Sequence, residues 1–237
     1  MADHSIELPQ VTFDFHQPLP DATCVLFLGG RMPSDAWAGK MLALQKNASI
    51  VAVDRGVATC RRLGIAPDLL LGDADSAAQD DWTWGEKNAA HVERHPIEKD
   101  FTDTQLALQR ATQEDAVLLL TGAFGGRFDH AYSTMFSATQ VKTPCVLADE
   151  RETIAYLHAG ETLTLHCHTQ PKAISLLPMT AAVTGVTAKG LHWPLKGATL
   201  TQVLPNAVSN VLEADTRDCT ISIRSGCLAV YACWVNR

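Results

Sequence analysis

The stretch "VLLLTGAFGGRFDH", residues 117–130, joins a continuous apolar run to a turn that holds three glycines, an arginine and an aspartate. An apolar run without alternating polar residues is typical of a strand buried on both faces, as in a parallel sheet covered by helices. A core strand does not need this concentration of glycine and charge at its end. The stretch therefore predicts a parallel α/β sheet with a functional loop at the carboxyl end of one strand.

The same order of apolar run, polar turn and helical pattern recurs through the first 150 residues. Capping residues mark the expected helix starts: Ser34 for the first helix, Ser76 for a helix through Trp84, and Thr102 or Asp103 for a later one. Gly64 is expected to end the short helix that follows residue 54. The predicted strands cover residues 24–28, 49–53, 69–71, 91–96, 117–120 and 144–147.

From about Gly160 the helical patterns fade, and short alternating runs separated by Gly, Pro and Asn follow one another. This spacing is typical of a β-sandwich or β-barrel. The predicted fold is an N-terminal parallel-sheet α/β (Rossmann-like) catalytic domain, residues 20–152, followed by a C-terminal all-β sandwich or barrel domain, residues 153–237. The predicted strands of the second domain cover 161–167, 173–177, 182–187, 199–204, 219–223 and 227–234.

Composition narrows the class of protein. A net charge of -7 over 237 residues argues against nucleic acid or an anionic membrane as the main partner. Seven cysteines without a CxxC pair indicate reduced thiols, and hence a cytoplasmic protein. The opening residues MADHSIELPQ lack the apolar run of a signal peptide, and no stretch approaches the roughly 20 apolar residues of a membrane span.

Aspartates follow several of the predicted strands. Asp73 and Asp75 in GDADS would point the same way in an extended segment, about 6–7 Å apart along the chain. Two such carboxylates repel each other unless a cation lies between them, and Mg²⁺ prefers carboxylates, water and phosphate oxygens. Asp100 or Asp103 in KDFTD is a candidate third ligand. The alternative is that these acids only cap helices.

Positive charge is expected beside the acids. Arg127 suits bidentate contact with phosphate, and Lys99 adds a second cation. Gly125 and Gly126 allow backbone N–H groups to approach an anion closely. The alternative is a surface turn in which Arg127 forms an ion pair with Asp129. No P-loop motif is present.

Three motifs together resemble those of the thiamine pyrophosphokinase (thiamine diphosphokinase) family. GDADS is similar to the family's G-D-x-D-S, EKDFTDTQLAL to K-D-x-T-D-x-x-x-A-L, and GAFGGRFDH to G-x-x-G-G-R-x-D-H. In the second half, GLHWPL and LPNAVSN resemble the G-L-x-W-x-L and S-N elements of its thiamine-binding domain. The resemblance spans roughly residues 24–234, and the motifs occur in the family's order.

The resemblance implies transfer of the pyrophosphoryl group of ATP to the hydroxyl of thiamine, with release of AMP, by a homodimer whose active site lies at the subunit interface. It implies that Asp73, Asp75 and Asp103 hold Mg²⁺ and that Asp100 or Asp103 takes the hydroxyl proton, so these four acids are the catalytic residues. The implied ATP-binding residues are Asp54, Lys99, Thr102, Arg127 and Asp129. The backbone N–H groups of Gly125 and Gly126 complete the predicted ATP-binding set.

Thiamine carries a cationic thiazolium and an aromatic pyrimidine, and an indole face suits such a ring. Trp193 is therefore the candidate thiamine seat, with Ser209 and Asn210 as hydrogen-bonding partners. The alternatives are that Trp193 is a core tryptophan and that Ser209 and Asn210 form a simple β-turn. Three other functions also fit aspartates gathered at the strand ends: a pyrophosphokinase for a pterin alcohol, a non-catalytic nucleotide-binding sensor, and a metal-dependent phosphohydrolase.

Overall fold

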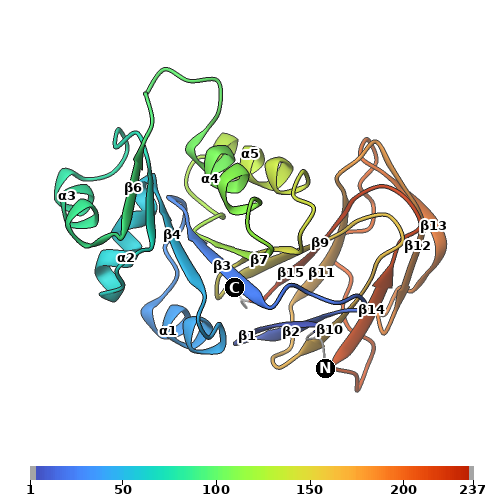
Figure 1. Cartoon of the computed structure of the whole chain (residues 1–237). Coiled ribbons are helices and arrows are strands. Elements are labelled where there is room, and N and C mark those ends of the chain that lie inside the picture. Colours follow the sequence, from blue (N-terminus) through green and yellow to red (C-terminus); the bar gives the residue numbers. More distant parts are fainter. Residues whose placement is uncertain (1–3, 235–237) are drawn as a thin grey trace. The chain divides into compact units, whose positions relative to one another are not determined.

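The computed structural model describes residues 4–234, which form two compact units with a mixed α/β fold (Figure 1). The first, here called the α/β unit, comprises residues 20–149. The second, called the β unit, combines residues 150–234 with residues 4–19. The sequence analysis assigned no element to residues 4–19, which contribute two strands to the β unit.

Six parallel strands form the sheet of the α/β unit, in the order β8-β7-β3-β4-β5-β6. The chain runs outward from β3 to β6 and then returns to place β7 and β8 on the other side of β3. The strand order therefore reverses between β3 and β7, which is where open parallel sheets bind ligands. The strands are β3 Ala22–Phe27, β4 Ser49–Val53, β5 Leu69–Gly72, β6 His91–Arg94, β7 Ala116–Thr121 and β8 Cys145–Ala148.

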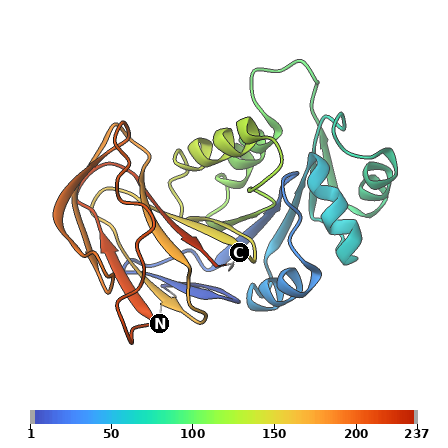
Figure 2. The ribbon, with the colours of Figure 1, turned by 180° about the vertical axis from the view of Figure 1, so that it is seen from behind.

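Helices lie on both sides of this sheet. Figure 1 and the view from behind in Figure 2 show α1 on the opposite side of β3 and β4 from α4 and α5. Ser34 caps α1 as predicted, Gly64 ends α2 in the left-handed region, and Thr102 forms a capping box with Gln105 at α4. The elements are α1 Asp35–Leu44, the 3-10 helix η1 Asp54–Gly56, α2 Val57–Leu63, α3 Gln79–Asn88, α4 Asp103–Ala111 and α5 Phe128–Ala138.

The predicted start of α3 is wrong. The helix begins at Gln79, three residues after Ser76, which was the expected capping residue. Its N-cap is Ala78. The Ser76 hydroxyl donates a hydrogen bond to the carboxylate of Asp54 instead. Ser76 thus bonds to a residue 22 positions away in the chain instead of capping the helix that follows it. No local sequence pattern reveals this partner.

The core of the α/β unit is made by the apolar runs from which the fold was predicted. All six residues of β7 are buried, as are the last four of β3. Burying one leucine side chain contributes roughly 1.5–3 kcal/mol, so this run anchors the glycine-rich turn that follows it. In the described part of the chain no helix is both long and apolar enough to span a membrane.

The β unit contains only strands as regular elements within the described residues. Six antiparallel strands pair in the order β1-β2-β10-β14-β12-β13, and three more pair as β11-β15-β9. The strands are β1 Ser5–Leu8, β2 Val11–Phe15, β9 Glu152–Leu157, β10 Thr162–Cys167, β11 Ala173–Pro178, β12 Ala182–Lys189, β13 Leu195–Thr201, β14 Asp218–Ser222 and β15 Leu228–Cys233.

One predicted strand of this unit is misplaced, and three strands were missed. The strand expected at 199–204 is β13, which begins at Leu195 and ends at Thr201. The chain then turns back, because the amide of Leu204 bonds to the carbonyl of Thr201 at 3.2 Å. The missed strands are β1, β2 and β9. The alternation VTFDF in β2 was a visible signal, since its buried positions fall at every second residue.

Candidate active site

The loops that follow β3, β4, β5 and β7 meet the loop before α4 in one cleft of about 470 Å³. It lies within the α/β unit, at the strand ends beside the reversal of strand order. Five aspartates and three Lys or Arg side chains line it, together with glycines from two turns. The cleft therefore combines features suited to a cation and to an anionic ligand.

Two glycine turns meet backbone to backbone at the reversal between β3 and β7. The amide of Gly30 donates to the carbonyl of Gly122 at 2.8 Å, and a Cβ on Gly30 would lie 2.4 Å from that same oxygen. Gly122 has φ 72°, and a Cβ there would lie 2.3 Å from the carbonyl oxygen of Leu28. Gly122 in "VLLLTGAFGGRFDH" and Gly30 after β3 thus allow the ends of the adjacent strands β3 and β7 to contact each other.

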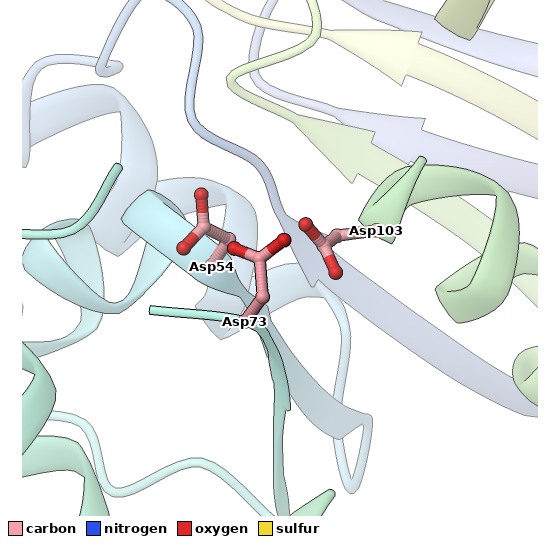
Figure 3. Close-up of side chains that lie close together, drawn as sticks. All are labelled: Asp54, Asp73 and Asp103. Atoms are coloured by element: carbon pink, nitrogen blue, oxygen red, sulfur yellow. The ribbon is translucent and has the colours of Figure 1, made fainter. Parts of the chain in front are cut away.

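Three carboxylates converge in the cleft (Figure 3). Asp54 of η1, Asp73 after β5 and Asp103 at the start of α4 point toward one another, with one oxygen from each within 4.8 Å of the others. Among the described residues, one oxygen of Asp54 is buried without a hydrogen-bond partner, and the buried oxygen of Asp103 has only an ion pair with Lys99. Buried polar atoms normally have partners, so this donor set fits a hard cation such as Mg²⁺.

Lys99 contacts the same cluster. Its ammonium donates to Asp73 and to the carbonyl of Pro96, and it lies 3.3 Å from the carboxylate of Asp103. Burial raises the pKa of Asp73, but hydrogen bonds from Lys99 and from the amide of Asp75 outweigh it and lower that pKa overall. Burial and the charge of Asp73 raise the pKa of Asp103. One lysine offsets only part of the negative charge, which leaves room for a cation.

Asp75 does not have the extended geometry expected from the sequence. Ala74 has φ 66°, a left-handed conformation, so the side chains of Asp73 and Asp75 do not follow a strand. The amide of Asp75 instead donates to the carboxylate of Asp73 at 3.2 Å. Asp75 is exposed at the cleft and lies outside the convergent group, in which Asp54 occupies the third place. A hydrogen bond with Asp73 raises the pKa of Asp75.

Asp100 and Thr102 also line the cleft, and both are exposed. The Thr102 hydroxyl accepts from the amide of Gln105 at 3.2 Å, while the Gln105 side chain accepts from the amide of Thr102 at 2.9 Å. This capping box sets the first turn of α4, whose first residue is Asp103. Thr102, one of the two capping residues that the sequence predicted, therefore positions Asp103.

Arg127 lines the cleft but is engaged by Asp129. The guanidinium donates through Nε and Nη2 at 3.1 and 2.6 Å to the two carboxylate oxygens of Asp129. Both side chains are exposed, as in the ion pair that the sequence left open as an alternative. The hydrogen bond from Arg127 lowers the pKa of Asp129. A phosphate in the cleft must therefore use the remaining donors of Arg127 or displace Asp129, which is not a lining residue.

The start of α5 offers further donors to an anion. Gly125 and Gly126 both line the cleft with positive φ, and the side chain of the N-cap residue Arg127 makes no capping hydrogen bond. The amide of His130 in the first turn already donates to Asp129 at 3.0 Å, so the amides before it are the ones left for an anion.

The predicted thiamine-binding residues lie in the β unit. Trp193 is 59% exposed, so it is not a core tryptophan. The Asn210 side chain accepts from the amide of Trp193 at 3.1 Å and donates to its carbonyl at 2.8 Å. Ser209 has φ 60°, and its amide donates to the hydroxyl of Ser175. Asn210 thus fixes the backbone of Trp193, a contact that the sequence analysis did not foresee.

Comparison with known proteins identifies the family. Residues 41–147 match the model of the thiamin pyrophosphokinase catalytic domain, and residues 162–228 match that of its vitamin B1 binding domain. The chain belongs to the thiamin pyrophosphokinase family. The catalytic-domain match contains all three convergent aspartates, and the second match contains Trp193, Ser209 and Asn210.

Individual members of the thiamin pyrophosphokinase family resemble the chain over most of its length. Thiamine pyrophosphokinase of Bacillus subtilis is 27% identical over 166 residues, which is 68% of this chain and 77% of that protein. The crystal structure of a B. subtilis thiamine pyrophosphokinase superposes with a TM-score of 0.75 at 23% identity, covering 91% of this chain and 99% of the other. Yeast thiamin pyrophosphokinase superposes with a TM-score of 0.67 at 16% identity, covering 89% and 86%.

Arg55 is a cleft residue that the sequence analysis did not assign to the site. It follows Asp54 directly, is exposed and lines the cleft. In the sequence it stands just after the end of a predicted strand.

Proposed function

We propose that this protein is a thiamine diphosphokinase, which transfers the pyrophosphoryl group of ATP to the hydroxyl of thiamine and releases AMP. The observation that carries the proposal is the convergence of Asp54, Asp73 and Asp103 in a glycine-lined cleft, within the region that matches the family's catalytic domain. The match of residues 162–228 to a vitamin B1 binding domain supports thiamine as the acceptor.

In this reaction the hydroxyl oxygen of thiamine forms a bond to the β-phosphorus of ATP. The bond from that phosphorus to the oxygen bridging to the α-phosphorus breaks, and AMP leaves with the bridging oxygen. The hydroxyl proton passes to a carboxylate, for which Asp100 and Asp103 are the two candidates at the cleft. Little covalent chemistry is left to the protein, so positioning and charge stabilisation dominate.

Asp54, Asp73 and Asp103 are the residues proposed to hold Mg²⁺, with Asp75 beside them. When bound, the ion would neutralise phosphate charge and fix the orientation of the phosphate oxygens. Lys99 holds Asp73 in place through a hydrogen bond. Gly125, Gly126 and the start of α5 are proposed to contact the phosphates through the backbone, with Arg127 supplying positive charge.

Trp193 is proposed to stack on thiamine, because its exposed indole offers a face to a cationic aromatic ring. Asn210 holds the Trp193 backbone with two hydrogen bonds and retains one amide N–H for the ligand. We further propose a homodimer in which each active site draws its acids from one chain and Trp193, Ser209 and Asn210 from the other.

A cytoplasmic location is proposed from the thiols. All seven cysteines are free, and six of them are buried. Burial raises the pKa of the Cys60 and Cys145 thiols to about 12, which keeps them in the unreactive neutral form. Free, unreactive thiols suit a reducing compartment.

The direct test is incubation with ATP, Mg²⁺ and thiamine, followed by chromatography of the products. Thiamine diphosphate and AMP in equal amounts are expected. A pterin alcohol, supplied in place of thiamine, should not be a substrate. Release of inorganic phosphate without AMP would indicate a phosphohydrolase, and ATP binding without any product would indicate a sensor; either result would overturn the proposal.

A further inference from the structure

The cationic side chains of the cleft differ in whether their donors are already occupied. Lys99 donates to Asp73 and to the carbonyl of Pro96 and lies beside Asp103. Arg127 is held by both oxygens of Asp129. Each of these cations therefore has only part of its donors left for an incoming phosphate.

Arg55 is the exception among the Lys and Arg side chains that line the cleft. Within residues 4–234 its guanidinium has neither an ion pair nor a hydrogen bond, and the residue is exposed. Several aspartates line the same cleft, and Arg55 is covalently next to one of them, Asp54. A guanidinium that stays unpaired beside carboxylates has all five N–H donors available to a ligand.

Gly29, which lies close to Arg55, leaves space for the Arg55 side chain. A Cβ on Gly29 would lie 3.1 Å from the Cβ of Arg55 and 3.9 Å from its Nε. The φ of Gly29 is outside the left-handed region, so its backbone conformation does not require glycine. The missing side chain instead provides room for the Arg55 stem to lie over the end of β3.

This location suits a polyphosphate. Arg55 follows β4, and Gly29 follows β3, the next strand toward β7. Arg55 therefore shares the cleft with the acidic cluster, to which its neighbour Asp54 belongs, and with the glycine turn after β7. A nucleotide that contacts a cation at the cluster and backbone amides at the glycine turn has its phosphate chain in the cleft that Arg55 lines.

We propose that Arg55 binds a phosphate oxygen of the nucleotide, as the cleft-lining cation whose donors are all available to the ligand. The inference rests on the proposed function for the identity of the ligand. A guanidinium presents two parallel N–H donors to phosphate, which a glutamine amide cannot match in charge or geometry. Loss of one such charge-assisted contact weakens binding roughly tenfold to hundredfold.

The test compares Arg55→Gln with Arg110→Gln. Arg110 is half-buried, with its side chain 41% exposed, and lies outside the cleft lining, where it pairs with Glu93 and Glu114, so both variants lose one positive charge at a solvent-accessible site. Binding of MgATP in the absence of thiamine would be measured by calorimetry, with adenosine as the uncharged comparison. Arg55→Gln should weaken MgATP binding at least tenfold, leave adenosine binding unchanged and flatten the salt dependence, and Arg110→Gln should alter none of these.

Steady-state kinetics add a second readout. Arg55→Gln should raise KM for ATP while KM for thiamine stays constant, and Arg55→Lys should recover part of the loss. Unchanged MgATP binding in Arg55→Gln, an equal loss of adenosine binding, or no MgATP binding by the wild-type protein would each overturn the inference. Specific loss of MgATP binding in a protein that forms no thiamine diphosphate would support the inference and reject the proposed function.

Discussion

Asp73 contacts or faces the other charged residues of the acidic cluster. It accepts hydrogen bonds from Lys99 and from the amide of Asp75, and its carboxylate faces Asp54 and Asp103. Its pKa is lowered despite burial, because these hydrogen bonds favour the charged form. The charge of Asp73, rather than its volume, is therefore the property on which a cation at this site depends.

Asp73→Asn is expected to reduce turnover by more than about a hundredfold, since it removes one charge of the cation site at nearly constant volume. Formation of AMP and thermal melting would be measured on the same preparation. Asp80→Asn, at an exposed position of α3, is the matched control and should leave turnover unchanged. Wild-type turnover in Asp73→Asn at saturating Mg²⁺ would contradict the assignment.

Arg127→Lys is expected to lower the affinity for ATP roughly tenfold to hundredfold, because lysine cannot form a planar bidentate contact with phosphate. Asp129→Asn is the informative companion, since it removes the ion pair but leaves the guanidinium in place. If Arg127 serves only that ion pair, both variants will behave alike in ATP titrations. If it binds phosphate, Asp129→Asn will retain or increase ATP affinity.

At the scale of elements, η1 shows how backbone packing places a functional residue. Gly56 has an ordinary helical conformation, yet a Cβ there would lie 1.8 Å from the carbonyl oxygen of Phe27. The turn that carries Asp54 and Arg55 therefore packs directly on the end of β3. Any side chain at residue 56 must push this turn away from the sheet.

Gly56→Ala is expected to destabilise the α/β unit by roughly 1–3 kcal/mol and to reduce turnover with it, because Asp54 moves with the turn. Gly39→Ala in α1 is the matched control, since no atom lies within 4 Å of the added Cβ and the position is helical. That control should raise stability by about 0.5–1 kcal/mol. Thermal melting of both variants measures the difference, and equal melting temperatures would refute the packing argument.

At the scale of the whole molecule, the acids and the proposed thiamine seat belong to different units of the chain. A homodimer with shared sites predicts that two inactive variants complement each other. Asp73→Asn and Trp193→Ala would be mixed, partly denatured to exchange subunits, and refolded. About a quarter of wild-type activity is expected, since half of the randomly formed dimers are mixed and each has one intact site.

The control is each variant taken through the same refolding alone, which should remain inactive. Subunit exchange would be verified with two different affinity tags on the two variants. If exchange is complete and activity does not return, each chain builds its own site, and the shared-site proposal is rejected.

The sequence by itself determined the parallel sheet of the α/β unit and the edge at which the polar residues gather. The strand predicted at 49–53 has the same bounds in the structure, and the caps at Ser34, Gly64 and Thr102 are where local rules place them. These features depend on runs of apolar residues and on hydrogen bonds within a few positions. Such information is local, so it can be read along the chain.

Only the tertiary structure decided which carboxylates converge. Asp54 joins Asp73 and Asp103, while the left-handed Ala74 leaves Asp75 outside the group, although its motif suggested otherwise. The pairing of Ser76 with Asp54 is equally non-local. The geometry of the cluster depends on how β4, β5 and α4 pack, because packing sets the distances between side chains that lie up to about 50 residues apart in the chain.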